Sequence, residues 1–391
     1  MSGQARFKEV SPTRIVQEVL MYAIERSASD IHFDPRADAM HVRFRVDGLL
    51  YPLAKIRYSI MPQIINHIKV LAQLNIAQRK VPQDGKFRFL AQQRDIDVRV
   101  STFPTLIGEK AVLRILDRHA QPIALEKLGF GQKMYQDFCA LLKKSSGFFL
   151  VSGPTGSGKT TTLYSALAAL HDPSKHIITL EDPIEYQIPG ITQGHIYPPA
   201  GFTFETGMRA LLRQDPDIVM IGEIRDAQTA GIAIEAALTG HLVFSTIHTN
   251  DAPSVIMRLM DMGIEPFLIN AAITGLLAQR LARILCTACK HQVELTTQEK
   301  EVLAIYQYPY THAWASKGCT QCAHLGHKGR MGIFELLVMS DELRMLIVQH
   351  PSFEQIRRQA LKDHMITLMH DGVAKVAQGL ISASELLRVL A

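Results

Sequence analysis

The pattern of apolar and polar residues predicts two kinds of domain along the chain. In the first third, Met40–Val46 and Ile96–Val100 alternate apolar and polar residues, as strands with one buried face do. Ala111–Leu116 is a third candidate strand, and Ile15–Ile24 has apolar residues at helical spacing. These segments predict a small α+β N-terminal domain over residues 1–116. The segment 117–129 mixes proline, glutamine and charged residues and is predicted to be a linker.

From residue 130 the pattern changes to short apolar runs separated by helical segments. The spacing favours an α/β core over 130–285, with a mostly parallel sheet covered by helices on both faces. A longer apolar run, Phe267–Cys286, carries a glutamine and two arginines, so we interpret it as a buried or amphipathic helix and not a membrane span. We expect a helical C-terminal region over 326–391, in which Ser352–Gln355 resembles a capping box. The apolar runs of the core are 147–152, 176–180, 217–221 and 241–246.

Composition limits the class of protein. Of the 391 residues, 47% are hydrophobic and 20% are charged, which excludes a disordered or collagen-like chain. Forty-two basic against 37 acidic residues give a formal net charge of +5, too small an excess to indicate a nucleic-acid-binding protein. The first residues are polar and show no secretory signal. We therefore expect a cytoplasmic protein whose association with a membrane comes only through partners.

One motif predicts a phosphate-binding loop. The residues Gly-Pro-Thr-Gly-Ser-Gly-Lys-Thr match GxxxxGK[ST], with an apolar run before them and a helical segment after them. The glycines let main-chain N–H groups turn toward phosphate oxygens, and the following helix adds its positive N-terminal end. Lys159 would reach the β- and γ-phosphates, and the Thr160 hydroxyl would hold Mg²⁺. The predicted nucleotide-binding residues of this loop are Gly153, Pro154, Thr155, Gly156, Ser157, Gly158, Lys159, Thr160 and Thr161.

Three further apolar runs end in residues that can carry chemistry. Glu223 follows one of them, at the place where a P-loop ATPase puts a carboxylate that faces Mg²⁺ or water. Glu181 and Glu185 follow another, where they could hold magnesium or act as a general base. Together with Asp182 they are three carboxylates at one strand end, and charge alone favours a solvated acidic loop there. His248 ends a third run, and spacing alone does not distinguish a functional from a structural histidine there.

Four of the five cysteines form two CxxC pairs. Cys286 and Cys289 are separated from Cys319 and Cys322 by 29 residues, and two such pairs complete a closed Cys₄ shell for a structural Zn²⁺. Four unrelated thiols or a redox motif are the alternatives, and the redox motif lacks its flanking βαβ context. We therefore predict a tetracysteine metal-binding insert over 286–325. Cys139 lies outside it and is expected to be a small buried hydrophobe.

Taken in order, these motifs resemble the Walker A, Asp-box, Walker B and His-box elements of the secretion ATPase superfamily. The likeness is to its GspE/PilB branch, which serves type II secretion and type IV pilus assembly. It extends into the first domain and covers nearly the whole chain. Many members carry a further N-terminal domain that docks to an inner-membrane partner, and this chain begins at about the domain after it. The matching segments of the first domain are Ser29–Pro35, Phe44–Gly48, Asp97–Pro104 and Gly108–Arg114.

The resemblance implies a fold and site roles that spacing cannot supply. The fold is a RecA-like P-loop ATPase core with a parallel-sheet centre, a small α+β N-terminal domain, a zinc-binding insert and a helical C-terminal region. Secretion and pilus-extension members share the tetracysteine insert, whereas pilus-retraction members generally lack it. From composition alone, the two arginines among the implied residues would be solvated strand charges. The implied roles are Lys159 and Thr160 as Walker A ligands, Glu185 as catalytic base, Glu223 as Walker B glutamate, His248 as γ-phosphate sensor, and Arg99 and Arg114 as arginines approaching the phosphates.

The function implied by the resemblance is a homohexameric motor that hydrolyses ATP to ADP and phosphate with Mg²⁺. It would act on an inner-membrane pilus or secretion platform and would not contact nucleic acid directly. Two alternatives stay open. A hexameric nucleic-acid motor, such as a DNA pump or helicase, is permitted by the Walker motifs but not favoured by the small net charge. A nucleotide-gated assembly scaffold without turnover is not favoured by the intact Glu185 and Glu223.

Overall fold

The computed structural model describes residues 11–91, 94–117, 121–308 and 310–390. The chain divides near residue 120 into two compact units, the N-terminal and the C-terminal unit, and Glu185–Gln187 group with the N-terminal unit. Among the described residues, no helix combines the length and the apolar character that crossing a bilayer requires.

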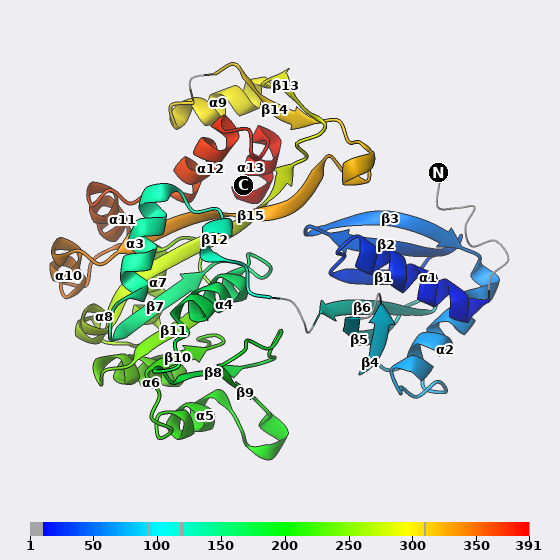
Figure 1. The fold of residues 1–391 in the computed structure, drawn as a ribbon, viewed down its shortest axis with the longest axis horizontal. Helices are drawn as coiled ribbons and strands as arrows, with labels where there is room; N and C mark the ends of the chain where they lie inside the picture. Colours follow the sequence, from blue (N-terminus) through cyan, green and yellow to red (C-terminus); the bar gives the residue numbers. More distant parts are fainter. Residues whose placement is uncertain (1–10, 92–93, 118–120, 309, 391) are drawn as a thin grey trace. The chain divides into compact units, whose positions relative to one another are not determined.

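The N-terminal unit is an antiparallel sheet with two helices on one face (Figure 1). Its strand order is β3-β2-β1-β6-β5-β4, and the two helices pack against each other and against β1 and β6. Burial alternates residue by residue along β2, so the face under the helices is apolar and the opposite face is polar. The elements are α1 (Pro12–Glu25), β1 (Asp30–Pro35), β2 (Met40–Val46), β3 (Leu49–Ile56), α2 (Met61–Leu71), β4 (Gln83–Ala91), β5 (Arg94–Pro104) and β6 (Glu109–Asp117).

A seven-stranded sheet with the order β15-β12-β7-β11-β10-β8-β9 forms the centre of the C-terminal unit (Figure 1). Neighbouring strands are parallel except for β12 and β15. Every residue of β7, β8, β10 and β11 is buried, which requires cover on both faces of the sheet, as the sequence predicts. The elements up to β11 are α3 (Gln132–Leu142), β7 (Gly147–Ser152), α4 (Lys159–Leu170), β8 (Ile177–Glu181), β9 (Thr192–His195), α5 (Phe204–Leu211), β10 (Ile218–Ile221), α6 (Ala227–Leu238) and β11 (Leu242–Ile247).

The interpretation of Phe267–Cys286 as one helix is wrong for most of its length. After α7 (Pro253–Asp261), only the short helix α8 (Pro266–Ala272) forms, and β12 (Ile273–Leu285) then crosses the sheet between β7 and β15. The first seven residues of β12 are all buried, so the strand shows no alternation of apolar and polar positions. A long apolar run of this kind has the same pattern in a buried strand and in a buried helix.

The cysteine-containing segment lies between two strands of the main sheet. It forms a small two-stranded sheet and a helix, made of β13 (Lys290–Glu294), α9 (Thr297–Ile305) and β14 (His312–Ser316). The region predicted as helical then begins with a strand, β15 (His327–Val338), which pairs with β12. The capping box predicted at Ser352–Gln355 is present and starts one of the helices that follow. These helices are α10 (Asp341–Ile347), α11 (Phe353–Lys362), α12 (Leu368–Ala377) and α13 (Ala383–Leu390).

Candidate nucleotide-binding site and metal centre

Four adjacent parallel strands bring the predicted motifs to one edge of the sheet. The strands β7, β11, β10 and β8 are neighbours in this order and all run in the same direction. The glycine-rich loop follows β7, His248 follows β11, Glu223 follows β10, and Glu185 lies four residues beyond the end of β8. The carboxyl ends of parallel strands are where open α/β sheets bind ligands. The sheet order therefore brings together residues that are far apart in the sequence.

The loop between β7 and α4 has the backbone that a phosphate cradle requires. Gly153, Gly156 and Gly158 all have positive φ angles, of 143°, 79° and 87°. A Cβ added at Gly153 would lie 2.6 Å from Ser157 Oγ, so a larger residue cannot take this place. Helix α4 starts at Lys159 and no side chain caps its N-terminus. Its first N–H groups can therefore bind an anion.

Lys159 lies folded back on this loop. Its Nζ donates hydrogen bonds to the carbonyl oxygens of Gly153 at 2.8 Å and Pro154 at 3.1 Å, and the residue is 9% exposed. Burial lowers the pKa of Lys159 to about 8, with the carboxylate of Glu223 acting against this shift and the charge of Arg280 adding to it. The ammonium is thus held by the carbonyls of the loop that would surround the phosphates.

Glu223 and His248 meet, as neighbouring strand ends predict. His248 Nε2 lies 3.6 Å from Glu223 Oε2, and Arg225 donates a hydrogen bond to the other oxygen of the same carboxylate. The two strand ends are fastened together, because the Thr246 hydroxyl donates to the Gly222 carbonyl at 2.7 Å. Arg225 was not predicted from the sequence. It lies two residues after Glu223, and its contact with that carboxylate depends on the turn after β10.

The two glutamates of the acidic segment are placed differently. Glu181 is buried at the end of β8, where its carboxylate accepts hydrogen bonds from Tyr164, from the Thr179 hydroxyl at 2.6 Å and from Gln193 Nε2 at 3.1 Å. This carboxylate fastens α4 and β9 to β8, and its predicted role in nucleotide binding stays a prediction. Glu185 is exposed in the loop that follows, and its role as a base is likewise untested.

Two residues of β12 that carry no recognised motif hold the loops around the site. Gln279 is 2% exposed, and its Nε2 donates to the Ser157 carbonyl at 2.8 Å while its Oε1 accepts from the Thr162 hydroxyl at 2.7 Å. Arg280 Nη2 donates to the Asn250 carbonyl, two residues after His248, at 2.9 Å. The only sequence signal was that polar residues interrupt an apolar run. That signal excluded a membrane span, but it also marked a contact with the phosphate-binding loop, by Gln279, and one with the segment after His248, by Arg280.

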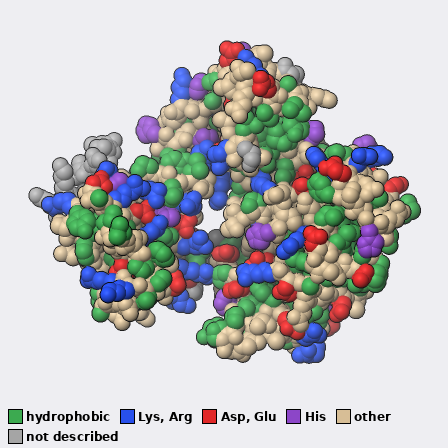
Figure 2. Space-filling view, turned by 180° about the vertical axis from the view of Figure 1, so that it is seen from behind, with side chains coloured by type: hydrophobic (Ala, Val, Ile, Leu, Met, Phe, Trp, Pro, Cys, Tyr) green, Lys and Arg blue, Asp and Glu red, His purple; other side chains and the backbone are tan. Residues whose placement is uncertain are grey.

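The predicted arginines of the N-terminal unit lie side by side on the polar face of its sheet. Arg99 and Arg114 are direct cross-strand partners, and Lys86 is the partner of Arg99 on its other side. Arg114 Nε contacts Asp30 Oδ1 at 3.1 Å, whereas no ion pair of Arg99 is found among the residues that the structure describes. Figure 2 shows Lys and Arg side chains distributed over this unit. Directly opposed like charges destabilise a sheet, so this row of cations favours an anionic ligand.

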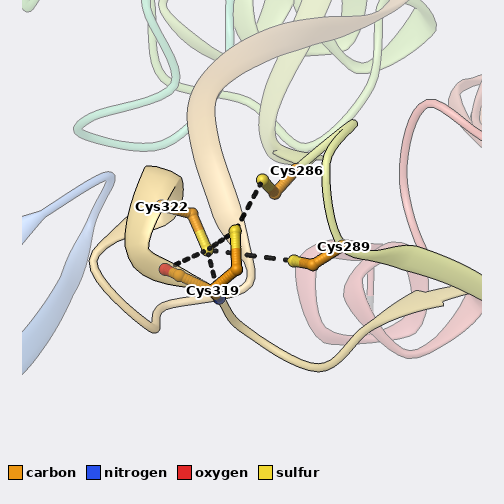
Figure 3. Close-up of side chains that lie close together, drawn as sticks. All are labelled: Cys286, Cys289, Cys319 and Cys322. Atoms are coloured by element: carbon orange, nitrogen blue, oxygen red, sulfur yellow. Dashed lines mark hydrogen bonds between the residues drawn. The ribbon is translucent and has the colours of Figure 1, made fainter.

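The four cysteines of the insert converge as a metal site requires (Figure 3). Their sulfur atoms all lie within 4.8 Å of one another, and the contacts are 3.9 Å for Cys286–Cys319, 3.9 Å for Cys289–Cys322 and 3.8 Å for Cys319–Cys322. Sulfurs at about 2.3 Å from a tetrahedral Zn²⁺ are roughly 3.8 Å apart. The sulfur positions therefore fit Zn²⁺, and an ion held by all four thiolates would have no open position for catalysis.

The electrostatics of Cys322 also suit a thiolate ligand. Burial alone would raise the pKa of this thiol, but hydrogen bonds from the N–H groups of Cys319 and Gly326, and from the thiols of Cys319 and Cys289, together outweigh it and lower the pKa to about 6. The two N–H groups lie 3.1 Å and 3.2 Å from Cys322 Sγ. Because a metal binds the thiolate and not the thiol, these bonds prepare the sulfur for coordination.

We expect the purified protein to contain about one equivalent of zinc per chain. Replacing Cys286 and Cys289 together by serine should abolish zinc binding, because two thiolates cannot hold the tetrahedral ion. The segment 287–321 should then become sensitive to proteolysis. Elemental analysis and limited proteolysis measure both effects, with Cys139→Ser as the matched control that should keep its zinc. Full zinc content in the double variant would contradict the assignment.

Comparison with known proteins places these features in a family. A family model described as "Type II/IV secretion system protein" matches residues 7–388. The chain belongs to this family. It is 44% identical over 381 residues to the type IV pilus assembly ATPase PilB of Thermus thermophilus, covering 97% of this chain and 43% of that protein. It is 43% identical over 376 residues to the type II secretion system ATPase E of Vibrio cholerae, covering 96% of this chain and 75% of that protein.

Solved structures agree with the fold. The ATPase DotB of Legionella pneumophila superposes with a TM-score of 0.72 at 21% identity, over 97% of this chain and 96% of that chain. The pilus retraction motor PilT gives a TM-score of 0.62 at 26% identity, over 97% of both chains. The predicted RecA-like α/β fold and the predicted membership of the secretion ATPases are therefore confirmed. The chain spans less than half the length of the Thermus relative and about three quarters of the Vibrio one.

Proposed function

We propose that this chain hydrolyses ATP to ADP and phosphate as a homohexameric motor for type II secretion or for type IV pilus extension. The observation that carries the proposal is the meeting of Lys159, Glu223 and His248 at the carboxyl edge of four parallel strands. A cationic loop, a carboxylate and a histidine at one edge supply charge for the phosphates and a group that orients water. Relatives named as secretion and pilus-assembly ATPases support the same reaction.

The residues would divide the work as follows. Lys159 leaves the carbonyls of its own loop and binds the β- and γ-phosphates. The phosphates are negatively charged and therefore bind the ammonium more strongly than neutral carbonyls do. Thr160 and Glu223 would hold Mg²⁺, which would neutralise the charge developing on the phosphates. Glu185 accepts the proton of the attacking water, and His248 contacts the γ-phosphate while staying within reach of Glu223. Arg99 and Arg114 add positive charge from the N-terminal unit.

The partners and location proposed for the motor follow its branch of the family. The tetracysteine site fits Zn²⁺, and relatives that assemble pili or secrete proteins are the ones that this chain resembles in sequence. We place it in the cytoplasm, at the inner membrane only through a platform protein of the pilus or secretion system. The excess of five positive charges over the whole chain gives no support for a nucleic-acid substrate.

Steady-state phosphate release by the full chain tests this function. We expect Mg²⁺-dependent ATP hydrolysis that is abolished in Lys159→Ala, which serves as the background control. Addition of single-stranded or double-stranded DNA should not change the rate. Stimulation by DNA with a steep salt dependence would favour a nucleic-acid motor, and ATP binding without turnover would favour a nucleotide-gated scaffold.

ATP affinity should fall as the pH rises above about 8. Lys159 has a pKa of about 8 in the free protein because it is buried, and phosphates would raise that pKa. Below that pH the ammonium is already charged, so affinity is at its plateau. Above it, binding requires uptake of a proton, and affinity should decrease by up to about tenfold per pH unit. Titration calorimetry in buffers of different ionisation enthalpy measures both the ATP affinity and the number of protons taken up on binding. Equal affinity from about pH 7 to about pH 9 would contradict the expected coupling.

A further inference from the structure

Glu335, on β15, is a buried carboxylate that holds the N-termini of two helices from different parts of the chain. Its Oε1 accepts a hydrogen bond from the Ala252 N–H at 2.8 Å, and its Oε2 accepts one from the Leu368 N–H at 3.3 Å. Ala252 is the residue immediately before α7, and Leu368 is the first residue of α12. The residue is 4% exposed. One largely buried side chain therefore supplies both contacts.

The chemistry of the position requires a carboxylate. The first N–H groups of a helix have no partner within the helix, and the Leu368 N–H is one of these in α12. At α7, Asp251 Oδ1 accepts from the Ser254 N–H at 2.8 Å, and Glu335 takes the N–H of Ala252 just before the helix. Both oxygens of Glu335 are used, whereas a glutamine offers only one acceptor and a methionine offers none of comparable strength. Burial raises the pKa of Glu335 and the charge of Asp251 adds to the rise, while the two N–H bonds and Arg357 act against it. Keeping a charge here is costly, so the residue is more than a space-filling side chain.

The two contacts lead to the nucleotide site and to the C-terminal helices. On one side, only Thr249, Asn250 and Asp251 separate His248 from Ala252, and Arg280 Nη2 also holds this short segment through the Asn250 carbonyl. On the other side, α12 packs on β15 and on α13. The carboxylate is thus a direct connection between the segment that follows the His box and the C-terminal helical region.

We propose that Glu335 is a positioning residue that couples His248 to α12. Each oxygen has its own helix, so a shift of about 1 Å at either N-terminus must break a hydrogen bond or move the other helix with it. A change in the position of His248 when nucleotide binds is thereby passed to α12, and the rigid C-terminal helices hold His248 in place for turnover. The proposal rests on the ATPase function proposed above and adds the route by which the site reaches the C-terminal region.

Kinetics of two variants test the positioning role. Glu335→Gln removes one acceptor and Glu335→Met removes both at similar volume. We expect kcat to fall roughly 10-fold to 100-fold in each, because misplacing a catalytic group by about 1 Å costs on the order of 100-fold. KM for ATP should stay within about threefold, since the phosphate-binding loop is untouched. A purely structural role would also lower the apparent kcat at constant KM by reducing the active fraction, so kcat is normalised to the fraction of chains that bind ATP. A wild-type value of this normalised kcat would overturn the proposal.

The matched control is the double variant Asp371→Asn/Lys375→Met. Asp371 lies on α12, its Oδ2 accepts from the Phe334 N–H at 2.8 Å, and it pairs with Lys375 in a buried site. Phe334 is the neighbour of Glu335 on β15, so this pair joins the same strand to the same helix without touching the segment 249–252. Replacing both charges leaves no single buried charge behind. We expect this control to keep kcat within about twofold, and a loss equal to that of Glu335→Gln would reduce the effect to general packing of α12.

Hydrogen exchange tests the coupling itself and needs no turnover. With Mg²⁺ and the non-hydrolysable analogue AMP-PNP, wild-type protein should change its exchange both at 249–255 and at 366–372. In Glu335→Gln the change should be confined to 249–255. A wild-type response confined to 249–255, or an unaltered response of 366–372 in the variant, would overturn the proposal. Failure of the proposed function has a different signature, namely absent phosphate release by the wild-type chain.

Discussion

Replacing Glu223 by glutamine is expected to leave ATP binding near the wild-type level and to lower kcat by roughly 10²–10⁴. The change keeps the size of the side chain but removes its charge, which faces Lys159, Arg225 and His248. Binding depends mainly on the loop of Gly153–Thr160, which the substitution does not touch. Hydrolysis depends on a carboxylate that orients water and metal, which an amide replaces poorly. Phosphate release and titration with a fluorescent ATP analogue measure the two effects.

Two further variants make the Glu223 result specific. Glu235→Gln is the matched control, because it removes the same charge from an exposed position on α6 and should leave kcat unchanged. The double variant Glu223→Gln/His248→Ala should be no slower than the slower single variant, because residues that act as one unit lose their effect together. Turnover of Glu223→Gln within about threefold of the wild type would remove Glu223 from the catalytic site.

The sequence was sufficient where a local pattern carries its own geometry. The phosphate-binding loop needs glycines with positive φ angles between a strand and a helix, and eight consecutive residues specify all of this. Strands with one polar face, such as β2 and β5, are visible from alternation, and the short buried strands are visible because turns bound them. The capping box at Ser352–Gln355 is similarly local.

The sequence was insufficient where a residue's role depends on distant partners. β12 was misread because its first seven residues are buried on both faces of the sheet, so its apolar run carries no strand period. Gln279 contacts Ser157 and Thr162 across more than a hundred residues, and Glu335 contacts Ala252 across 83. Such contacts have no spacing rule. The signal for such a contact is a polar residue inside an apolar run, and this signal does not indicate which distant residue it binds.

The N-terminal arginines are where sequence and structure together make the sharpest test. Arg99 lies between Lys86 and Arg114 on the sheet, with no ion pair found among the described residues, so its charge is available for a ligand. Arg114 also contacts Asp30 and therefore has a structural role as well. An arginine that meets phosphates during transfer is worth roughly 10³-fold or more in rate. We expect Arg99→Ala to lose at least this much, with Arg88→Ala on the same face as the control that keeps its rate.

Mixing two inactive variants shows whether Arg99 serves its own chain or a neighbour. Arg99→Ala and Lys159→Ala should each be inactive alone. If Arg99 acts on the neighbour's nucleotide, mixed hexamers contain some sites with an intact Lys159 and the neighbour's intact Arg99, and activity partly returns. If it acts within its own chain, no site has both, and mixing restores nothing.

We expect no restoration, because Leu125 and Leu128 are already buried in the C-terminal unit. The seven residues left between Asp117 and Leu125 can span at most roughly 25 Å. Full activity of Arg99→Ala alone would instead show that the row of cations has no role in the reaction and is only a solvated face of the sheet.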